Sequence, residues 1–207
     1  MDLERFIEQR PYLYHLTSKT NATNIIAQKL LFSANQLIAL SGTNEQIRRE
    51  RRIGPFPLQV NGIEILLRDQ RPISPVALPK CLTDGWNIGD FLNHLNDRVF
   101  MWPTVDRLWR HYNRYAHEEP VIFRFSTGAI FEANPHVKFC RLNSGATRAN
   151  SHLGGKAPER GPGTFLTSTQ FNLPIREVAE VTFEEQCRLA GYISFSSSPD
   201  SEFIEVI

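Results

Sequence analysis

The sequence predicts an α+β fold in which a mixed β core is combined with helices concentrated in the N-terminal half. Apolar residues recur at helical spacing in several segments before residue 116, and runs of β-branched and aromatic residues dominate the chain after residue 177. Helices and strands do not alternate regularly, which argues against a doubly wound parallel sheet. No segment has the composition of a linker, so we expect residues 1–207 to form a single domain.

Capping residues and apolar periodicity define the elements of the first half. An apolar run ending in a polar turn is typical of a short buried strand. The side chain of Thr20 or Asn21 suits the cap of the next helix, and Asn61-Gly62 favours a type I′ turn because both residues tolerate positive φ. These signals predict a strand over 11–17, a helix after the cap, a helix near 35–40, a hairpin of 58–60 and 63–67, irregular chain over 69–87 and a short helix over 90–95.

In the second half the signals are proline stops, one strong helix and a glycine-rich loop. Pro103 stops a buried strand, and Thr104 caps an amphipathic helix. The segment 141–164 contains seven glycines or prolines and no period, so we expect a long functional loop. The predicted strands are 98–102, 121–125, 178–183, 191–195 and 203–207.

Composition excludes several classes of protein. With 41% hydrophobic residues and 22% charged residues, the chain is not intrinsically disordered. No apolar run is long enough to span a bilayer, and the first residues do not have the pattern of a signal peptide. The three cysteines are far apart and form no CxxC pair. We therefore expect a reduced, cytoplasmic protein that is not bound to a membrane.

The net charge of +1 conceals an uneven distribution. From Glu177 to the end there are seven acidic residues and one basic residue, so residues 1–176 carry +7. Arginine outnumbers lysine by 18 to 5, and the planar guanidinium suits phosphate and carboxylate recognition. The arginine content therefore indicates a phosphate-bearing ligand, while a drift in genome composition explains the same counts equally well.

Most familiar catalytic motifs are absent from the sequence. It has no phosphate-binding GxxxxGK[ST] loop, no dinucleotide-binding GxGxxG after a strand, no GxSxG and no HExxH. No set of residues has the spacing of a metal site, so we expect no metal. Each cysteine lacks an identifiable histidine partner and is expected to be a small core residue.

Three polar or aromatic features remain as candidates for a site. His15 and Thr17 lie at a strand end, where a structural histidine is the alternative. The aromatic residues of 98–102 suit stacking on a flat heterocycle or burial in the core. Glu180 is a lone carboxylate in an apolar strand, where it is disfavoured unless it is paired or used. An edge or solvent-facing position for Glu180 remains the alternative.

In their order along the chain, these residues resemble the DarT-type ADP-ribosyltransferases. Tyr14-His15-Leu16-Thr17 before a helix is similar to the family's opening strand, Val99-Phe100-Met101-Trp102-Pro103 to its aromatic block, and Ala179-Glu180-Val181 to its catalytic-glutamate strand. The basic stretch 47–52 stands where the family has an arginine that contacts NAD. The chain also resembles an uncharacterised bacterial branch of the same fold, whose pattern includes Arg68-Asp69-Gln70 and Asn143-Ser144-Gly145.

The resemblance implies a role for each matching residue. Glu180 would stabilise the charged ribose and act as the base, with Arg51 or Arg52 on the pyrophosphate of NAD. His15 and Thr17 would hold the adenosine ribose, and Phe100 or Trp102 would pack against nicotinamide. The whole chain would then be a single ADP-ribosyltransferase-like domain that uses NAD as co-substrate.

The acceptor is less defined than the cofactor, because the loop 141–164 departs from the family pattern. Arg148, Lys156 and Arg160 are expected to contact the phosphates of a DNA or RNA acceptor, although a solvated flexible loop is an equal alternative. The resemblance implies a bacterial toxin or phage-defence effector with an antitoxin protein as its partner. Transfer to a protein or small molecule, hydrolysis of NAD, and a non-catalytic binding module remain open.

Overall fold

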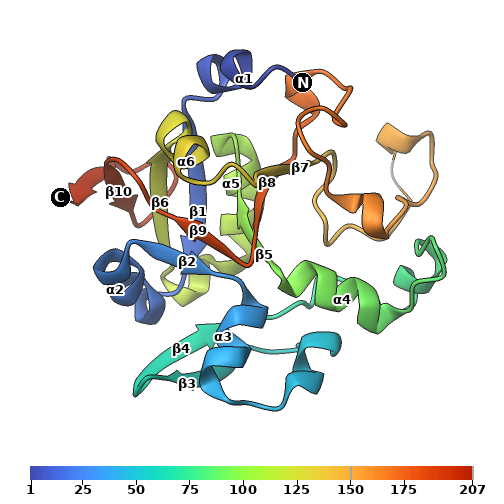
Figure 1. Ribbon diagram of the computed structural model, residues 1–207, viewed down its shortest axis with the longest axis horizontal. Helices are drawn as coiled ribbons and strands as arrows, with labels where there is room; N and C mark the ends of the chain where they lie inside the picture. Colours follow the sequence, from blue (N-terminus) through green and yellow to red (C-terminus); the bar gives the residue numbers. More distant parts are fainter. Residues whose placement is uncertain (150, 207) are drawn as a thin grey trace.

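Two antiparallel sheets form the centre of the computed structural model, which describes residues 1–149 and 151–206 (Figure 1). The first sheet has the order β1-β6-β10-β11 and the second the order β5-β8-β7. Their strands are β1 (Tyr12–Thr17), β5 (Arg98–Met101), β6 (Val121–Ser126), β7 (Lys138–Cys140), β8 (Glu180–Glu184), β10 (Ile193–Ser196) and β11 (Ile204–Val206). The α+β prediction is therefore confirmed, with strands in both halves of the chain.

The two sheets are joined at one point, between Tyr14 and Trp102. The amide of Tyr14 donates to the carbonyl of Trp102 over 2.9 Å, and the amide of Trp102 donates back over 2.8 Å. On its other edge β1 pairs with β6 along its whole length, whereas β5 pairs with β8. The carboxyl end of β1 is therefore free of strand pairing on the side that faces β5.

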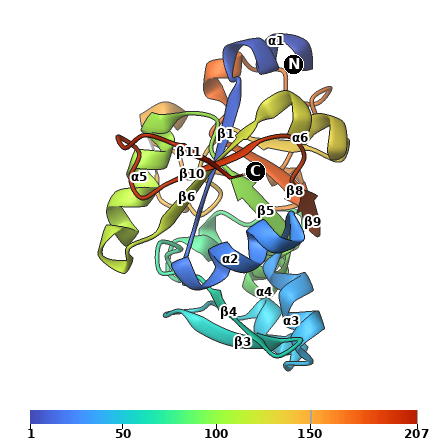
Figure 2. The same ribbon diagram turned by 90° about the vertical axis from the view of Figure 1, so that its left-hand side faces the viewer.

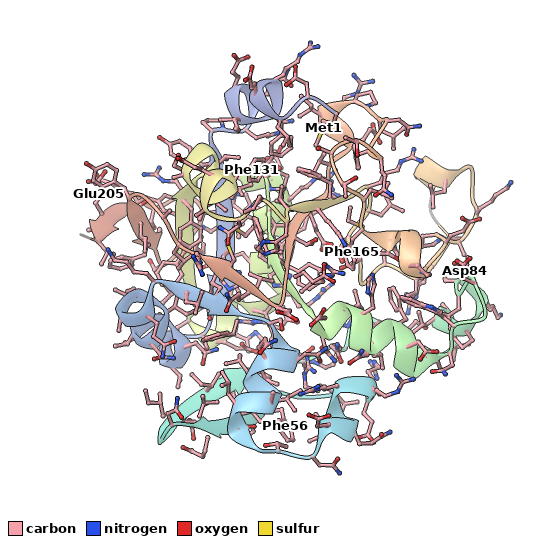
Figure 3. All side chains as sticks on the ribbon, viewed as in Figure 1. Met1, Phe56, Asp84, Phe131, Phe165 and Glu205 are labelled. Atoms are coloured by element: carbon pink, nitrogen blue, oxygen red, sulfur yellow. The ribbon has the colours of Figure 1, made fainter. Side chains whose placement is uncertain are left out.

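Alternation along the strands builds the largest core between the sheets. Leu13 of β1, Met101 of β5 and Val181 of β8 all lie in this core and are at most 1% exposed. Phe131, labelled in Figure 3, extends it upward by stacking on Phe6 at 5.7 Å between ring centroids. Each fully buried Leu or Phe contributes about 1.5–3 kcal/mol, so this cluster fixes the relative position of the sheets.

The described residues form six α-helices around the sheets, and most of these helices lie in the first 130 residues. They are α1 (Leu3–Gln9), α2 (Lys19–Gln28), α3 (Ala34–Ser41), α4 (Ile88–Asn96), α5 (Val105–Tyr115) and α6 (Thr127–Ala133). Thr104 caps α5 as predicted, and α5 packs against β1 (left in Figure 2). The predicted cap at Thr20 or Asn21 is wrong, because Ser18, two or three residues earlier, accepts from the amide of Asn21 and caps α2.

The predicted hairpin is confirmed as β3 (Phe56–Val60) and β4 (Ile63–Leu67). Asn61 and Gly62 have φ values of 51° and 78°, as a type I′ turn requires. The hairpin and α3 share a small apolar core and lie below the central sheets in Figure 1. Phe56 marks this region in Figure 3.

The remaining elements are short. A two-stranded ribbon pairs β2 (Leu30–Phe32) with β9 (Gln186–Arg188). The 3-10 turns are η1 (Glu45–Arg49), η2 (Leu78–Lys80), η3 (Ala116–Glu118), η4 (Ser151–Leu153), η5 (Pro162–Thr164) and η6 (Ile175–Glu177). The described part of the predicted loop 141–164 contains only η4 and η5, and Phe165 at its end packs on α4 (Figure 3). Ile207, the last residue of the predicted strand 203–207, lies outside the described residues.

Within the described ranges, no helix is long and apolar enough to cross a membrane.

The side chain of Asn21 docks the hairpin onto α2. Its amide nitrogen donates to the carbonyl of Leu66 over 2.9 Å, and its oxygen accepts from the Leu66 amide over 2.8 Å. Replacing Asn21 with Leu leaves both backbone groups of Leu66 without these partners, so we expect a loss of about 2 kcal/mol in the free energy of unfolding. Chemical denaturation measures this. Asn24→Leu on the same helix is the control, and equal losses in both variants would contradict the docking role.

Candidate functional site

A cavity of about 300 Å³ opens where β1 and β5 separate. On β1, Leu13 belongs to the core, and His15 and Thr17 continue the same face into the cavity. The chain after β4, the end of α4 and the face of α5 complete its walls. Six of the predicted site residues line it: His15, Thr17, Arg52, Phe100, Trp102 and Glu180.

Glu180 lies in the central strand of the three-stranded sheet and is 3% exposed. The predicted alternation holds within β8, since Val181 and Phe183 face the core, but not before it, where Val178 belongs to the core and Ala179 lines a cavity. The alternative of an edge or solvent-facing position is therefore wrong. One carboxylate oxygen, Oε2, accepts a hydrogen bond of 2.9 Å from the backbone amide of Ser144. A buried carboxylate with a fixed orientation is a plausible reactive group by its geometry alone.

Opposing effects act on the pKa of Glu180. Burial raises the pKa because the charged form is poorly solvated, and this effect prevails. The hydrogen bond from Ser144 and the charges of Arg160 and Arg107 act in the opposite direction. A carboxylate with a raised pKa is a better proton acceptor than an exposed one.

Arg160 supports the turn that presents Ser144 to Glu180. Its Nε and Nη2 donate to the carbonyl of Ala146, and Nη2 also donates to the carbonyl of Asn143 over 2.9 Å. Arg160 is 3% exposed, so its guanidinium has no surface on which an acceptor phosphate would fit. The structure thus places Arg160 in the loop scaffold and not on the acceptor side that its sequence position suggested.

His15 has one ring nitrogen engaged and one free for a ligand. Its Nδ1 lies 2.9 Å from the carbonyl oxygen of Phe100. Burial lowers the pKa of His15 to about 4, so the ring is neutral at pH 7. Because a carbonyl only accepts, Nδ1 carries the proton and Nε2 is an acceptor. Nε2 therefore suits a ligand hydroxyl as its donor.

Aromatic side chains form one wall of the cavity. Trp102 is 6% exposed and stacks on His111 of α5, with 4.3 Å between ring centroids. Burial lowers the pKa of His111 to about 3, and the charge of Arg68 contributes. Phe100 is half-buried and meets Phe165 edge to face. The wall is thus uncharged and flat.

Arg51 and Arg52, which the sequence could not distinguish, have different surroundings in the structure. Arg51 points away from the cavity and donates to the carbonyls of Gln70 and Arg71. Arg52 lines the cavity, where Nε donates to the Arg68 carbonyl and Nη2 to the side chain of Asn96. Its Nη1 is buried without a hydrogen-bond partner. Burial lowers the pKa of Arg52 to about 10, so it remains a cation at pH 7.

A polar cluster beside Arg52, whose Nε donates to the carbonyl of Arg68, had no assigned role at the level of sequence. Arg68 pairs with Glu118 at 3.0 Å and lies over the ring of Tyr115 at 4.0 Å. Asp69 binds Arg71 and accepts from the Tyr115 hydroxyl at 3.4 Å. The sequence signal that could have found this cluster is the pair Arg68-Asp69 directly after a hairpin strand. Its contact with Tyr115 of α5 could not be predicted, because it depends on tertiary packing.

Arg148 and Lys156 are exposed on the loop and do not line the cavity.

The cysteines are poor nucleophiles. Cys81, Cys140 and Cys187 are free and buried. Burial raises the pKa of Cys140 to about 12 and also raises the pKa values of the other two. Among the described residues, no three His, Cys, Asp or Glu side chains gather in a way that would hold a metal ion.

The cavity brings together a buried carboxylate, a neutral histidine and an arginine with an unpaired nitrogen, as a ligand-binding or catalytic site does. The chain belongs to a family of unknown function, DUF7002, whose pattern matches residues 11–190. This match includes every residue of the cavity named above. No curated protein and no solved structure matches the chain significantly.

The protonation state of His15 gives a direct test of the site's electrostatics. Because its folded-state pKa is about 4, below the unfolded value near 6.5, the ring contributes stability fully above pH 6.5 and loses it as pH falls toward 4. We expect the ring to stay in the neutral Nδ1–H form from pH 8 to about pH 5. Long-range ¹H–¹⁵N NMR spectra, assigned with a His15→Gln variant, measure this, and a midpoint near 6.5 would refute the assignment.

Proposed function

We propose that the protein is an NAD-dependent ADP-ribosyltransferase whose reaction centre is the cavity between β1 and β5. The observation that carries the proposal is the meeting of Glu180, His15 and Arg52 in one cavity although they come from distant parts of the chain. Their order also resembles that of the DarT-type enzymes. Each of the three has an unusual environment that suits a step of the reaction.

Arg52 is our choice for the pyrophosphate of NAD. Its Nε and Nη2 are held by protein oxygens, which fixes the plane of the guanidinium. The buried Nη1 has no partner in the protein, and a phosphate oxygen would satisfy it with a charge-assisted hydrogen bond. Arg51 does not line the cavity, so the proposal assigns it no contact with NAD.

The adenosine ribose is assigned to the end of β1. The free Nε2 of His15 accepts a hydrogen bond from a ribose hydroxyl, and the Thr17 hydroxyl lies two residues further on the same face of the strand. The nicotinamide ring is assigned to the wall that Phe100 and Trp102 form. A flat, uncharged wall suits a heterocycle that loses its positive charge as it leaves.

The reaction replaces one bond at ribose C1′ with another. The bond between C1′ and the nicotinamide nitrogen breaks, and its electron pair stays on nicotinamide. Positive charge develops on the ribose as in glycoside cleavage. The acceptor's lone pair then bonds to C1′, and the acceptor's proton passes to the carboxylate of Glu180. No other reactant is needed.

The burial of Glu180 makes its charge effective. In a site that excludes water, a carboxylate stabilises a nearby cation more strongly than it does in solvent. The amide of Ser144 holds the carboxylate in place before the reaction, so little reorganisation accompanies bond cleavage. The turn that Arg160 supports therefore acts on the reaction through Glu180.

Nucleic acid is the acceptor that we favour. Residues 1–176 carry a net charge of +7, and a basic surface favours phosphate-bearing partners. In this proposal the protein is a cytoplasmic toxin or phage-defence effector, restrained by an antitoxin protein. Mass spectrometry of DNA and RNA recovered after incubation with NAD identifies the acceptor and the modified base.

The variant Glu180→Gln tests the proposal. It keeps the shape of the side chain and removes its charge, so we expect nicotinamide release from NAD to fall by roughly 10²–10⁴-fold. Glu185→Gln, which changes an exposed residue just beyond β8, is the matched control and should retain activity. Chromatography of released nicotinamide, with DNA, RNA and protein supplied as separate acceptor pools, measures both.

Equal nicotinamide release by wild type and Glu180→Gln would contradict the catalytic assignment. Release in the absence of any acceptor would instead identify an NAD glycohydrolase. No release and no change of the melting temperature with NAD would favour a binding module, since a bound ligand raises apparent stability.

A further inference from the structure

A second cavity, of about 290 Å³, adjoins the first along α5. Three arginines of α5 line it: Arg107, Arg110 and Arg114. Its opposite wall includes Asn143 and Gly145 of the turn that binds Glu180, together with Ala179, the residue before Glu180. Trp102, His111 and Arg114 border both cavities. The second cavity therefore adjoins the one that Glu180 lines and shares the turn that holds its carboxylate.

The spacing of the three arginines places their side chains in one row. Positions i, i+3 and i+7 share a helix face, and α5 spans about 10 Å from Arg107 to Arg114 at a rise of 1.5 Å per residue. The apolar face of α5, with Leu108 and Tyr115, is packed against β1 and β6. The arginine row thus lies on the side of α5 that fronts the cavities.

The row lacks an ion-pair partner in the described part of the chain, although the nearby charges of Glu180 and Glu177 act to raise the pKa of Arg107. Within the described residues, none of the three arginines forms an ion pair, and the nearby Glu118 is occupied by Arg68 at 3.0 Å. His111, which lies between them on the helix, is neutral at pH 7. Burial lowers the pKa of Arg107, and the charge of Arg110 contributes. The arginines repel one another, and a bound anion would relieve this repulsion.

We infer that this arginine row binds the phosphodiester backbone of a single-stranded nucleic-acid acceptor and leads one nucleotide to Glu180. A row about 10 Å long suits several successive phosphates, whereas one phosphate of a small molecule would engage only part of it. The inference rests on the proposed function for the chemistry at Glu180. This inference assigns acceptor binding to α5 in place of the loop residues Arg148, Lys156 and Arg160.

Binding of labelled single-stranded DNA and RNA oligonucleotides of about 12 nucleotides, without NAD, tests the row by fluorescence anisotropy. The triple variant R107Q/R110Q/R114Q should bind at least about tenfold more weakly. The slope of log K against log salt should fall by about 2, because each lost phosphate contact in a single strand contributes about 0.7.

Two controls separate the row from net charge and from the loop. The triple variant R5Q/R176Q/R188Q removes the same charge at exposed positions outside both cavities, and R148Q/K156Q removes the bases expected from the sequence. Both should bind within about twofold of wild type. Circular dichroism and the melting temperature show whether each variant is folded.

Unchanged binding by the folded α5 variant, or equal weakening by the distant triple variant, would overturn the inference. Weakened binding of an acidic peptide but not of either oligonucleotide would also overturn it in favour of a protein acceptor. Oligonucleotide binding is measured without NAD, so it is independent of nicotinamide release. Unchanged oligonucleotide binding by the α5 variant refutes the proposed acceptor surface, whereas unchanged NAD cleavage by Glu180→Gln refutes the proposed function.

Discussion

The reciprocal backbone hydrogen bonds between Tyr14 and Trp102 are the constraint on which the rest of the structure depends. In the described part of the chain they form the backbone bridge between the two sheets. On one side of this bridge the strands enclose the main core, and on the other they separate into the cavity that contains His15 and Glu180. Because the bonds are between backbone atoms, the cavity's position follows from topology, while its chemistry follows from the side chains that line it.

The electrostatics of the site combine two neutral histidines with a buried acid and cations that are only partly paired. Burial keeps His15 and His111 neutral at pH 7, so neither histidine adds a positive charge to the site. The positive charge is instead on arginines: Arg52 lines the first cavity, and the α5 row lines the second. In the proposed function Arg52 binds a pyrophosphate, and in the further inference the α5 row binds a second phosphate-bearing molecule.

Local signals in the sequence were sufficient for several elements and insufficient for others. The Asn61-Gly62 turn, the Thr104 cap and the alternation within β8 were predicted correctly because each depends on neighbouring residues. The strands β2, β7 and β9 have three residues each, too few for a period, and form through pairing with distant segments. The choice between Arg51 and Arg52, and the burial of Arg160, also depend on carbonyl partners that only the folded chain supplies.

A crystal structure of the Glu180→Gln protein with NAD tests the central claim most directly, because this variant should bind NAD without cleaving it. The account predicts NAD in the cavity between β1 and β5, with its pyrophosphate on Nη1 of Arg52, a ribose hydroxyl on Nε2 of His15 and the nicotinamide ribose against residue 180. An empty cavity at saturating NAD, or NAD bound with its nicotinamide ribose away from residue 180, would contradict the account.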